Sequence, residues 1–220
     1  MSETNHFQHE LVTRARETAS GEFSHRHEFL PTFRLTLPRP HLKHLEETVD
    51  LLASCEFGPS VLAAAFLHDH ERLSPSWSFG RLEREFGSRV AILATWHSHH
   101  DQTHELHWRP ELHALTPRDL QESDSLRCAE QISVIRALSH HLSNANISPS
   151  LLRINWTQAL LRFEHQRERL AAHAHPFLVS LMHRELTKLE RLVFAVMAPA
   201  SVREPEFPET LDEALLMEES

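Results

Sequence analysis

The feature that most constrains the fold of this chain is a short segment, Val61 to Leu67, that is apolar on nearly every side and runs directly into His68 and Asp69. A helix that is hydrophobic all round is buried, so we interpret residues 61–70 as the central helix of a core. Such a helix places an imidazole and a carboxylate at the rim of that core. Both groups are good ligands for first-row divalent metals, so the segment also predicts a metal site.

The composition favours helix over sheet. The chain has 220 residues with only four glycines and no tyrosine, and it is rich in Leu, Ala, Glu and Arg. A chain of this length can bury one full hydrophobic core. We therefore expect an all-α bundle of roughly eight to ten helices. Residues 1–198 form one domain in this interpretation, and residues 199–220 form an acidic, proline-containing tail with one weak helix at 211–217.

Hydrophobic residues at helical spacing predict helices that are separated by Gly, Pro and Asn breaks. The expected helices are 8–19, 41–55, 61–70, 79–86, 89–96, 116–138, 151–173 and 176–197. Gly21 is the expected end of the first helix, and Ser60 is the expected N-cap of the central one. The three prolines between Phe23 and Pro40 predict a loop with an extended piece, and no strand-like alternation is evident.

Charge and cysteine usage exclude several classes of protein. The net charge is −9 with histidines neutral, which argues against nucleic-acid binding through a basic face. Cys55 and Cys128 are too few for a disulfide framework or a Cys-rich zinc site, and we interpret them as small buried hydrophobic residues. No apolar run is long enough for a membrane span, and the N-terminus does not resemble a signal peptide. We therefore expect a cytoplasmic protein without membrane contact.

Two further residues are candidates for the same metal site. His44 lies 24 residues before His68, on the preceding predicted helix, and Glu130 lies on the long helix expected over 116–138. Two imidazoles with acidic partners can hold a divalent ion that lowers the pKa of a bound water. The alternatives without metal are a surface position for His44, a structural hydrogen bond within the His68-Asp69 pair and an exposed helical position for Glu130.

Four segments, in this order, resemble the hydrolase (HD) domain of the RelA/SpoT homologue family, including its small stand-alone alarmone hydrolases. They are His44-Leu45 with Leu51-Leu52-Ala53 (family HP…ILA), Ala64 to Asp69 (AALLHD), Phe86 to Leu93 (FG..V..LV) and Cys128 to Leu138 (LADRLHNLRTL). Their order and spacing agree with the family over residues 10–140. The resemblance implies an HD-type helical bundle around one metal site.

The resemblance also implies a function. Members of this family bind one manganese ion (Mn2+) and remove the 3′-pyrophosphate from guanosine tetra- or pentaphosphate. By position, His44, His68 and Asp69 match three metal ligands, and Glu130 stands where the family has its fourth, an aspartate. The implied substrates are guanosine alarmones or related 3′-pyrophosphorylated adenine nucleotides. Small hydrolases of this type can serve as antitoxins to alarmone-making toxins.

The chain departs from the family in the acidic motif that helps to activate water. The family continues with HD..ED, whereas residues 68–72 read His-Asp-His-Glu-Arg, so Glu71 is the acidic residue there and comes one position early. Glu71 is the expected general base. Arg136 matches the family arginine and is expected to bind substrate phosphates or to brace the helix that carries Glu130. The family asparagine is Val134 here, which removes a polar contact near the site.

Other functions are compatible with the same residues. A different HD enzyme, such as a 5′-nucleotidase acting on deoxynucleoside monophosphates, needs the same ligand set. A catalytically degenerate domain would instead bind a nucleotide or a protein partner, and the acidic tail would contact a basic partner. The histidine cluster over 97–107 is interpreted as a solvated loop, with phosphate or zinc as alternative ligands. The sequence defines no oligomeric state.

Overall fold

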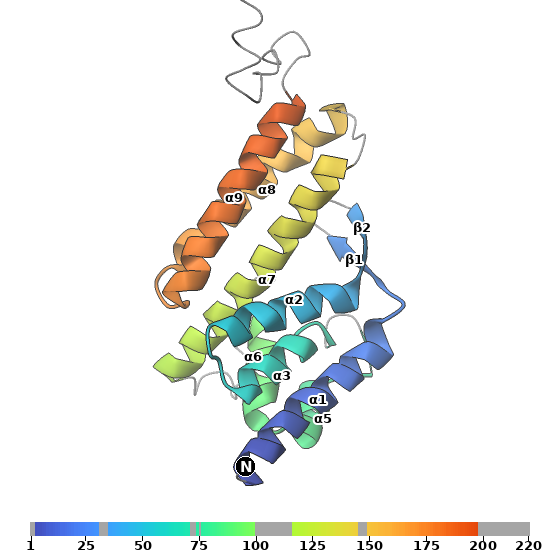
Figure 1. Ribbon diagram of the computed structural model, residues 1–220, viewed down its shortest axis with the longest axis vertical. Coiled ribbons are helices and arrows are strands. Elements are labelled where there is room, and N and C mark those ends of the chain that lie inside the picture. Colours follow the sequence, from blue (N-terminus) through green and yellow to red (C-terminus); the bar gives the residue numbers. More distant parts are fainter. Residues whose placement is uncertain are drawn as a thin grey trace, which may run out of the picture.

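The described part of the chain folds into a helical bundle with one small sheet (Figure 1). The structure is a computed structural model in which residues 3–30, 35–70, 74, 76–99, 116–144 and 149–197 are described. These residues form eight helices and one two-stranded antiparallel sheet. The expectation of an all-α bundle is therefore confirmed.

The elements follow the predicted order. The helices are α1 (Glu3–Phe23), α2 (His41–Ser54), α3 (Pro59–Leu67), α5 (Phe79–Phe86), α6 (Ser88–His99), α7 (Pro117–Asn144), α8 (Pro149–Leu170) and α9 (Pro176–Met197), and the strands are β1 (His27–Leu30) and β2 (Leu35–Pro40). None of the helices described is long and apolar enough to cross a membrane.

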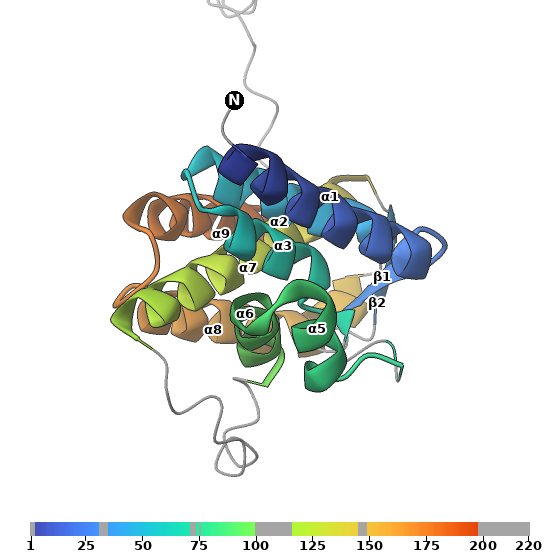
Figure 2. The same ribbon diagram turned by 90° about the horizontal axis from the view of Figure 1, so that it is seen from below.

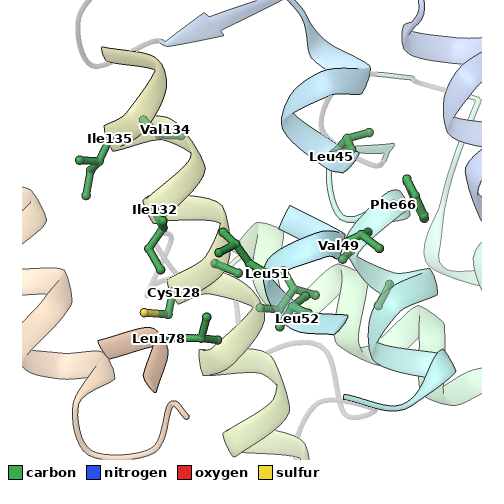
Figure 3. Packing of buried hydrophobic residues seen from close by; sticks show 14 of the residues in the cluster. Leu45, Val49, Leu51, Leu52, Phe66, Cys128, Ile132, Val134, Ile135 and Leu178 are labelled. Atoms are coloured by element: carbon green, nitrogen blue, oxygen red, sulfur yellow. The ribbon is translucent and has the colours of Figure 1, made fainter. Parts of the chain in front are cut away.

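Helix α7 organises the bundle because it contacts both halves of it. On one side α7 packs against α2, α3 and α6, and on the other it packs against the α8–α9 pair (Figure 1). Figure 3 shows Leu51 and Leu52 of α2 in the apolar layer beside Cys128 and Ile132 of α7. Leu52, Cys128 and Ile132 are fully buried, so this layer lies within the core.

The apolar helix α3 is enclosed, as its sequence predicts. It contacts α1, α2 and α6, which surround it in the view of Figure 2. Its alanines, Ala63 to Ala65, are completely buried. Small side chains let neighbouring helices approach closely, so α3 can be surrounded on several sides without leaving cavities. The helix ends at Leu67 and thereby delivers His68 and Asp69 to the edge of this core.

The start of α2 is set by prolines and by the sheet. Pro40 precedes the helix with φ −60° and ψ 140°, an extended conformation, and a proline also disfavours helix in the residue before it. The backbone N–H of His41 donates to the carbonyl of Arg26 at 2.7 Å, which ties the first turn of α2 to the segment before β1. His41 and His44 therefore lie in the first turns of α2, both facing the interior.

Three details of the predicted secondary structure are wrong. Helix α1 continues through Gly21 to Phe23, where the phenylalanine side chain is fully buried. Helix α3 begins at Pro59 with Gly58 as its N-cap, because a proline is preorganised for the first helical position, and Ser60 is not the cap. The segment expected to lack strand alternation forms the antiparallel pair of β1 and β2.

The sheet escaped prediction because its burial pattern reverses the usual hydrophobic alternation. Along β1 the side chains alternate between exposed and buried. Glu28 and Leu30 take the two buried positions of β1. Phe29, between them, is 51% exposed. Hydrophobic periodicity indicates a strand only when apolar residues take the buried positions. Glu28 is buried because it belongs to a polar cluster described below.

Two predicted regions lie outside the described residues, namely the acidic tail 199–220 and most of the histidine cluster, from His100 to His107. The cysteines can be placed. Cys128 is fully buried, as expected for a small hydrophobic residue, whereas Cys55 is half-buried, and both are free thiols.

We predict that Gly87→Ala lowers the free energy of unfolding by about 1–3 kcal/mol. Gly87 follows α5 with φ 89° and ψ 157°, a conformation available almost only to glycine. No atom lies within 4 Å of the position of an added methyl group, so the cost arises from the backbone alone. Urea denaturation monitored by circular dichroism measures the change.

Gly21→Ala is the matched control for this prediction. Gly21 lies inside α1, also with no atom within 4 Å of an added methyl group. Alanine is the better helix former there, so this variant should gain about 0.5–1 kcal/mol. Equal effects of the two substitutions would contradict the assigned backbone conformation of Gly87.

Candidate metal centre

Three of the four predicted metal ligands converge in the structure. His44 of α2, His68 at the end of α3 and Glu130 of α7 each offer a ligand atom, and these atoms all lie within 4.8 Å of one another. The two imidazoles are buried, with 2% and 1% of the residue exposed, and Glu130 is half-buried. The rings of His44 and His68 meet edge to face with centroids 5.8 Å apart. Helix packing therefore brings together residues that are 24 and 62 positions apart.

Asp69, the fourth predicted ligand, lies at the edge of this group. Its Oδ2 atom is 3.6 Å from His68 Nε2 and 2.9 Å from His41 Nε2. The carboxylate of Asp69 thus lies between His68, a predicted ligand, and His41, a buried histidine that was not predicted to belong to the site. A metal ion beside His68 Nε2 is within reach of Asp69, with His41 holding the carboxylate from the other side.

The hydrogen bond of His68 determines which ring nitrogen is available. Its Nδ1 atom lies 2.7 Å from the carbonyl oxygen of Ala65, which can only accept. Nδ1 therefore carries the proton, and in the neutral ring Nε2 has the lone pair. A lone pair and the oxygen of Asp69 repel each other unless a cation or a proton lies between them. The donor set therefore fits a metal ion.

His44 is oriented in the same way by a serine. Its Nδ1 atom is 3.1 Å from Ser133 Oγ, and that hydroxyl donates its own proton to Glu47 Oε2 at 2.9 Å. In the tautomer in which the serine oxygen accepts from His44 Nδ1–H, Nε2 of His44 has the lone pair; Arg39 Nη2, which can only donate, lies 3.4 Å from the same Nδ1. Metal-binding histidines commonly donate their second nitrogen to such a partner, which fixes the tautomer and the orientation of the ring.

Arg39 holds this outer layer together. Its guanidinium forms ion pairs with Glu28 of β1 and, at 3.0 Å, with Glu47 of α2. It also donates to the carbonyl of Ser133 at 3.2 Å and to the hydroxyl of Ser133 at 3.1 Å. One planar cation with several fixed donors thus links the sheet, α2 and α7 around His44.

Burial sets the protonation states in the cluster. The pKa of His44 lies well below its usual value, because burial disfavours the charged ring and His68 adds repulsion, which outweigh the attraction of Glu130 and Asp69. A neutral imidazole is the form that binds a metal. The pKa of Glu28 is raised by burial, against the opposing effect of Arg39, and the charge of Glu130 raises it further.

Five residues that contribute to the site were not selected from the sequence, namely Glu28, Arg39, His41, Glu47 and Ser133. Only His41 carried a usable signal, because it precedes His44 by three positions and so shares its face of a helix. The other four are ordinary surface-type residues in sequence. Their roles depend on long-range contacts, such as that between Arg39 and Ser133, 94 positions apart.

The remaining predicted site residues divide into two groups. Arg136 pairs with Glu47 at 3.1 Å and with Glu185 at 3.3 Å, so it ties α7 to α2 and α9. Val134, which replaces the family asparagine, is buried in the hydrophobic core. Glu71, the expected general base, lies outside the described residues, as does the histidine cluster apart from the backbone of its first residues in α6.

The geometry of the site therefore brings together two buried imidazoles, two carboxylates and an ordered polar layer behind them. No model of a protein family matches the chain, and no curated protein sequence matches it significantly.

We predict that Ser133→Ala weakens the binding of Mn2+ by about 10–100-fold. The substitution removes the acceptor for His44 Nδ1–H and leaves the ring free to rotate. Isothermal titration calorimetry of the metal-free protein with Mn2+ measures the affinity. Ser139→Ala is the control, because Ser139 is also buried on α7 and its hydroxyl has no hydrogen-bond partner among the described residues. Equal affinities in both variants would exclude the orienting role of Ser133.

A second prediction concerns His70, which is fully buried between the rings of Phe23 and Trp77, with centroids 4.7 and 5.0 Å away. Burial is the main cause that lowers its pKa from 6.5 to about 4. The unfolded chain therefore binds the proton more readily than the folded one. This difference lowers stability as the pH falls from about 6.5 to about 4, by roughly 3 kcal/mol over the whole interval.

His70→Gln tests this sign, because glutamine is similar in size and does not titrate. We expect the free energy of unfolding of the metal-free protein to fall more steeply between pH 6.5 and pH 4 in the wild type than in the variant. Urea denaturation at pH 7, 6, 5 and about 4.5 measures both slopes. Parallel curves would show that His70 titrates normally.

Proposed function

We propose that this protein is a metal-dependent phosphohydrolase that removes pyrophosphate from 3′-pyrophosphorylated nucleotides of the guanosine alarmone type. The observation that carries the proposal is the convergence of His44, His68 and Glu130 within 4.8 Å, from three different helices. The same three positions, with Asp69, are those at which the sequence resembles the metal ligands of the RelA/SpoT hydrolase domain. Geometry supports the metal chemistry, and the sequence segments support the substrate class.

A divalent ion held by these residues would lower the pKa of a bound water and offset the negative charge of a pyrophosphate leaving group. Imidazole and carboxylate donors suit several first-row metals. Manganese is proposed on the strength of the sequence resemblance.

The protein groups have distinct roles in this proposal. His44 and His68 are the imidazole donors, and their Nδ1 atoms lie within hydrogen-bond distance of Ser133 Oγ and of the Ala65 carbonyl. Asp69 and Glu130 supply negative charge that balances the ion. Glu71 follows two positions after Asp69, and we propose it as the base that takes a proton from the attacking water.

Glu130 in place of the family aspartate is compatible with the proposal. A glutamate is longer by one methylene, and the side chain of Glu130 spans the distance from α7 to the two histidines. The position is therefore able to supply a carboxylate to the site, although its residue type differs from that of the family.

In this proposal Arg136 has a structural role and holds α7 in position. Its guanidinium contacts Glu47 of α2, whose other oxygen accepts from Ser133, the partner of His44. Its second partner, Glu185, lies on α9. The arginine thereby fixes the register of α7, on which Glu130 is carried.

The test is manganese-dependent release of pyrophosphate from guanosine tetraphosphate by the purified protein, with elemental analysis of the same preparation. Asp69→Ala and Glu130→Gln should each lower both bound metal and turnover by more than about 100-fold. Glu46→Gln is the matched control, because Glu46 is on α2 but pairs with Arg16 at the surface. It should leave both quantities unchanged.

Each other outcome has a definite meaning. Undiminished turnover in Asp69→Ala would overturn the metal mechanism. Bound metal with turnover of deoxynucleoside monophosphates, and none of guanosine tetraphosphate, would identify a 5′-nucleotidase. Absence of both metal and turnover in the wild type would indicate a domain that acts by binding a nucleotide or a protein.

A further inference from the structure

The outward face of α9 carries a basic groove far from the metal ligands in sequence. The groove has a volume of about 630 Å³, and its described lining lies entirely on α9, between His183 and Ala195. Three permanent cations line it, namely Arg184, Lys188 and Arg191, and no described lining residue is acidic. Leu192 and Ala195 supply apolar surface between these charges.

The three cations lie in one stripe along α9 and form no ion pair in the described part of the chain. Their spacing of four and three positions places them along one face of a helix. All three side chains are exposed, and none forms an ion pair with another residue in the described part of the chain. By contrast, Glu185, which directly follows Arg184, is committed to Arg136. The charge of the stripe is therefore available to an anionic partner.

The groove also has an apolar neighbour. Phe194 lies three positions after Arg191 and is 67% exposed, one of the largest exposures of any apolar side chain in the described residues. An exposed aromatic ring beside a row of cations favours a partner that is acidic and partly hydrophobic. A free small anion would use the charges and leave the ring uncovered.

The C-terminal segment 199–220 of the same chain has this chemistry. It contains seven acidic residues and a single basic one, Arg203. Leu211 and Leu215 lie four positions apart within the weak helix expected at 211–217, so that helix would carry an apolar stripe between acids. We propose that this segment docks on the α9 groove of its own chain, with its acids on the cations and its apolar stripe toward Phe194.

Chain length and connection permit this docking. The segment starts two positions after Met197, the last residue of α9. The groove spans twelve helical steps, about 18 Å, whereas the 23 residues after Met197 can extend over roughly 70 Å. A direct tether gives an effective concentration in the millimolar range. Contacts that are individually weak, as surface ion pairs are, then suffice.

Hydrogen–deuterium exchange of the full-length chain tests the proposal. We expect amides between Glu204 and Met217 to exchange about ten-fold more slowly in the wild type than in the variant Arg184→Glu, Lys188→Glu, Arg191→Glu. The protection should fall in 0.5 M salt, and it should not change with protein concentration. Equal exchange in wild type and variant would overturn the proposal. Protection that grows with concentration would also overturn it, and would assign the groove to the tail of a second copy.

Two further variants keep the test specific. Arg16→Glu, Arg84→Glu, Arg118→Glu changes the net charge equally on α1, α5 and α7, and it should retain the protection. Combining the α9 variant with Glu204→Lys, Glu206→Lys and Glu209→Lys restores opposite charges and should recover it. Recovery of the protection in the combined variant would require direct pairing of the two segments. Loss of protection in both the α9 variant and the variant on α1, α5 and α7 would attribute the effect to net charge alone. The inference does not depend on the proposed enzymatic function.

Discussion

The packing of α7 against α2 is the contact on which the rest of the structure depends. In its apolar part Leu51 lies beside Cys128 and Ile132 (Figure 3), and in its polar part Glu47 pairs with Ser133 and Arg136. Buried polar groups are costly unless they are paired, so the polar part allows only a narrow range of registers between the two helices. That register places Glu130 opposite His44, and the position of the candidate metal centre follows from it.

Burial then determines the chemistry of the centre. Burial in the core holds the pKa of His44 well below its usual value, because a charged imidazole would lose its hydration there without adequate compensation. The carboxylate of Asp69 lies beside the His68 ring and Glu130 offers an oxygen to the same cluster, while Arg39 is engaged by Glu28 and Glu47. The site thus gathers imidazole nitrogens and carboxylate oxygens, which are donors that first-row divalent ions bind.

Helix α9 serves two purposes. It packs on α7 and α8 and supplies Glu185 to Arg136, so it supports the helix that carries Glu130. Its exposed side presents three cations that form no ion pair in the described part of the chain, and an exposed aromatic ring. Docking of the acidic segment there would place the end of the chain on a helix that also braces the site. The two proposals nevertheless rest on separate residues and can fail separately.

The sequence alone determined the helical architecture and most of the ligand candidates. Periodicity marked the helices, and the all-apolar segment before His68 and Asp69 required burial whatever surrounded it. The sequence could not predict that Glu28 is buried while Phe29 is exposed. Nor could it predict that His41 meets Asp69 or that Ser133 orients His44. Periodicity reports which face of an element is apolar, whereas the partner of a buried polar group is chosen by helix packing between distant segments. Tertiary structure therefore decided the outer layer of the site, and with it which nitrogen of each histidine faces the centre.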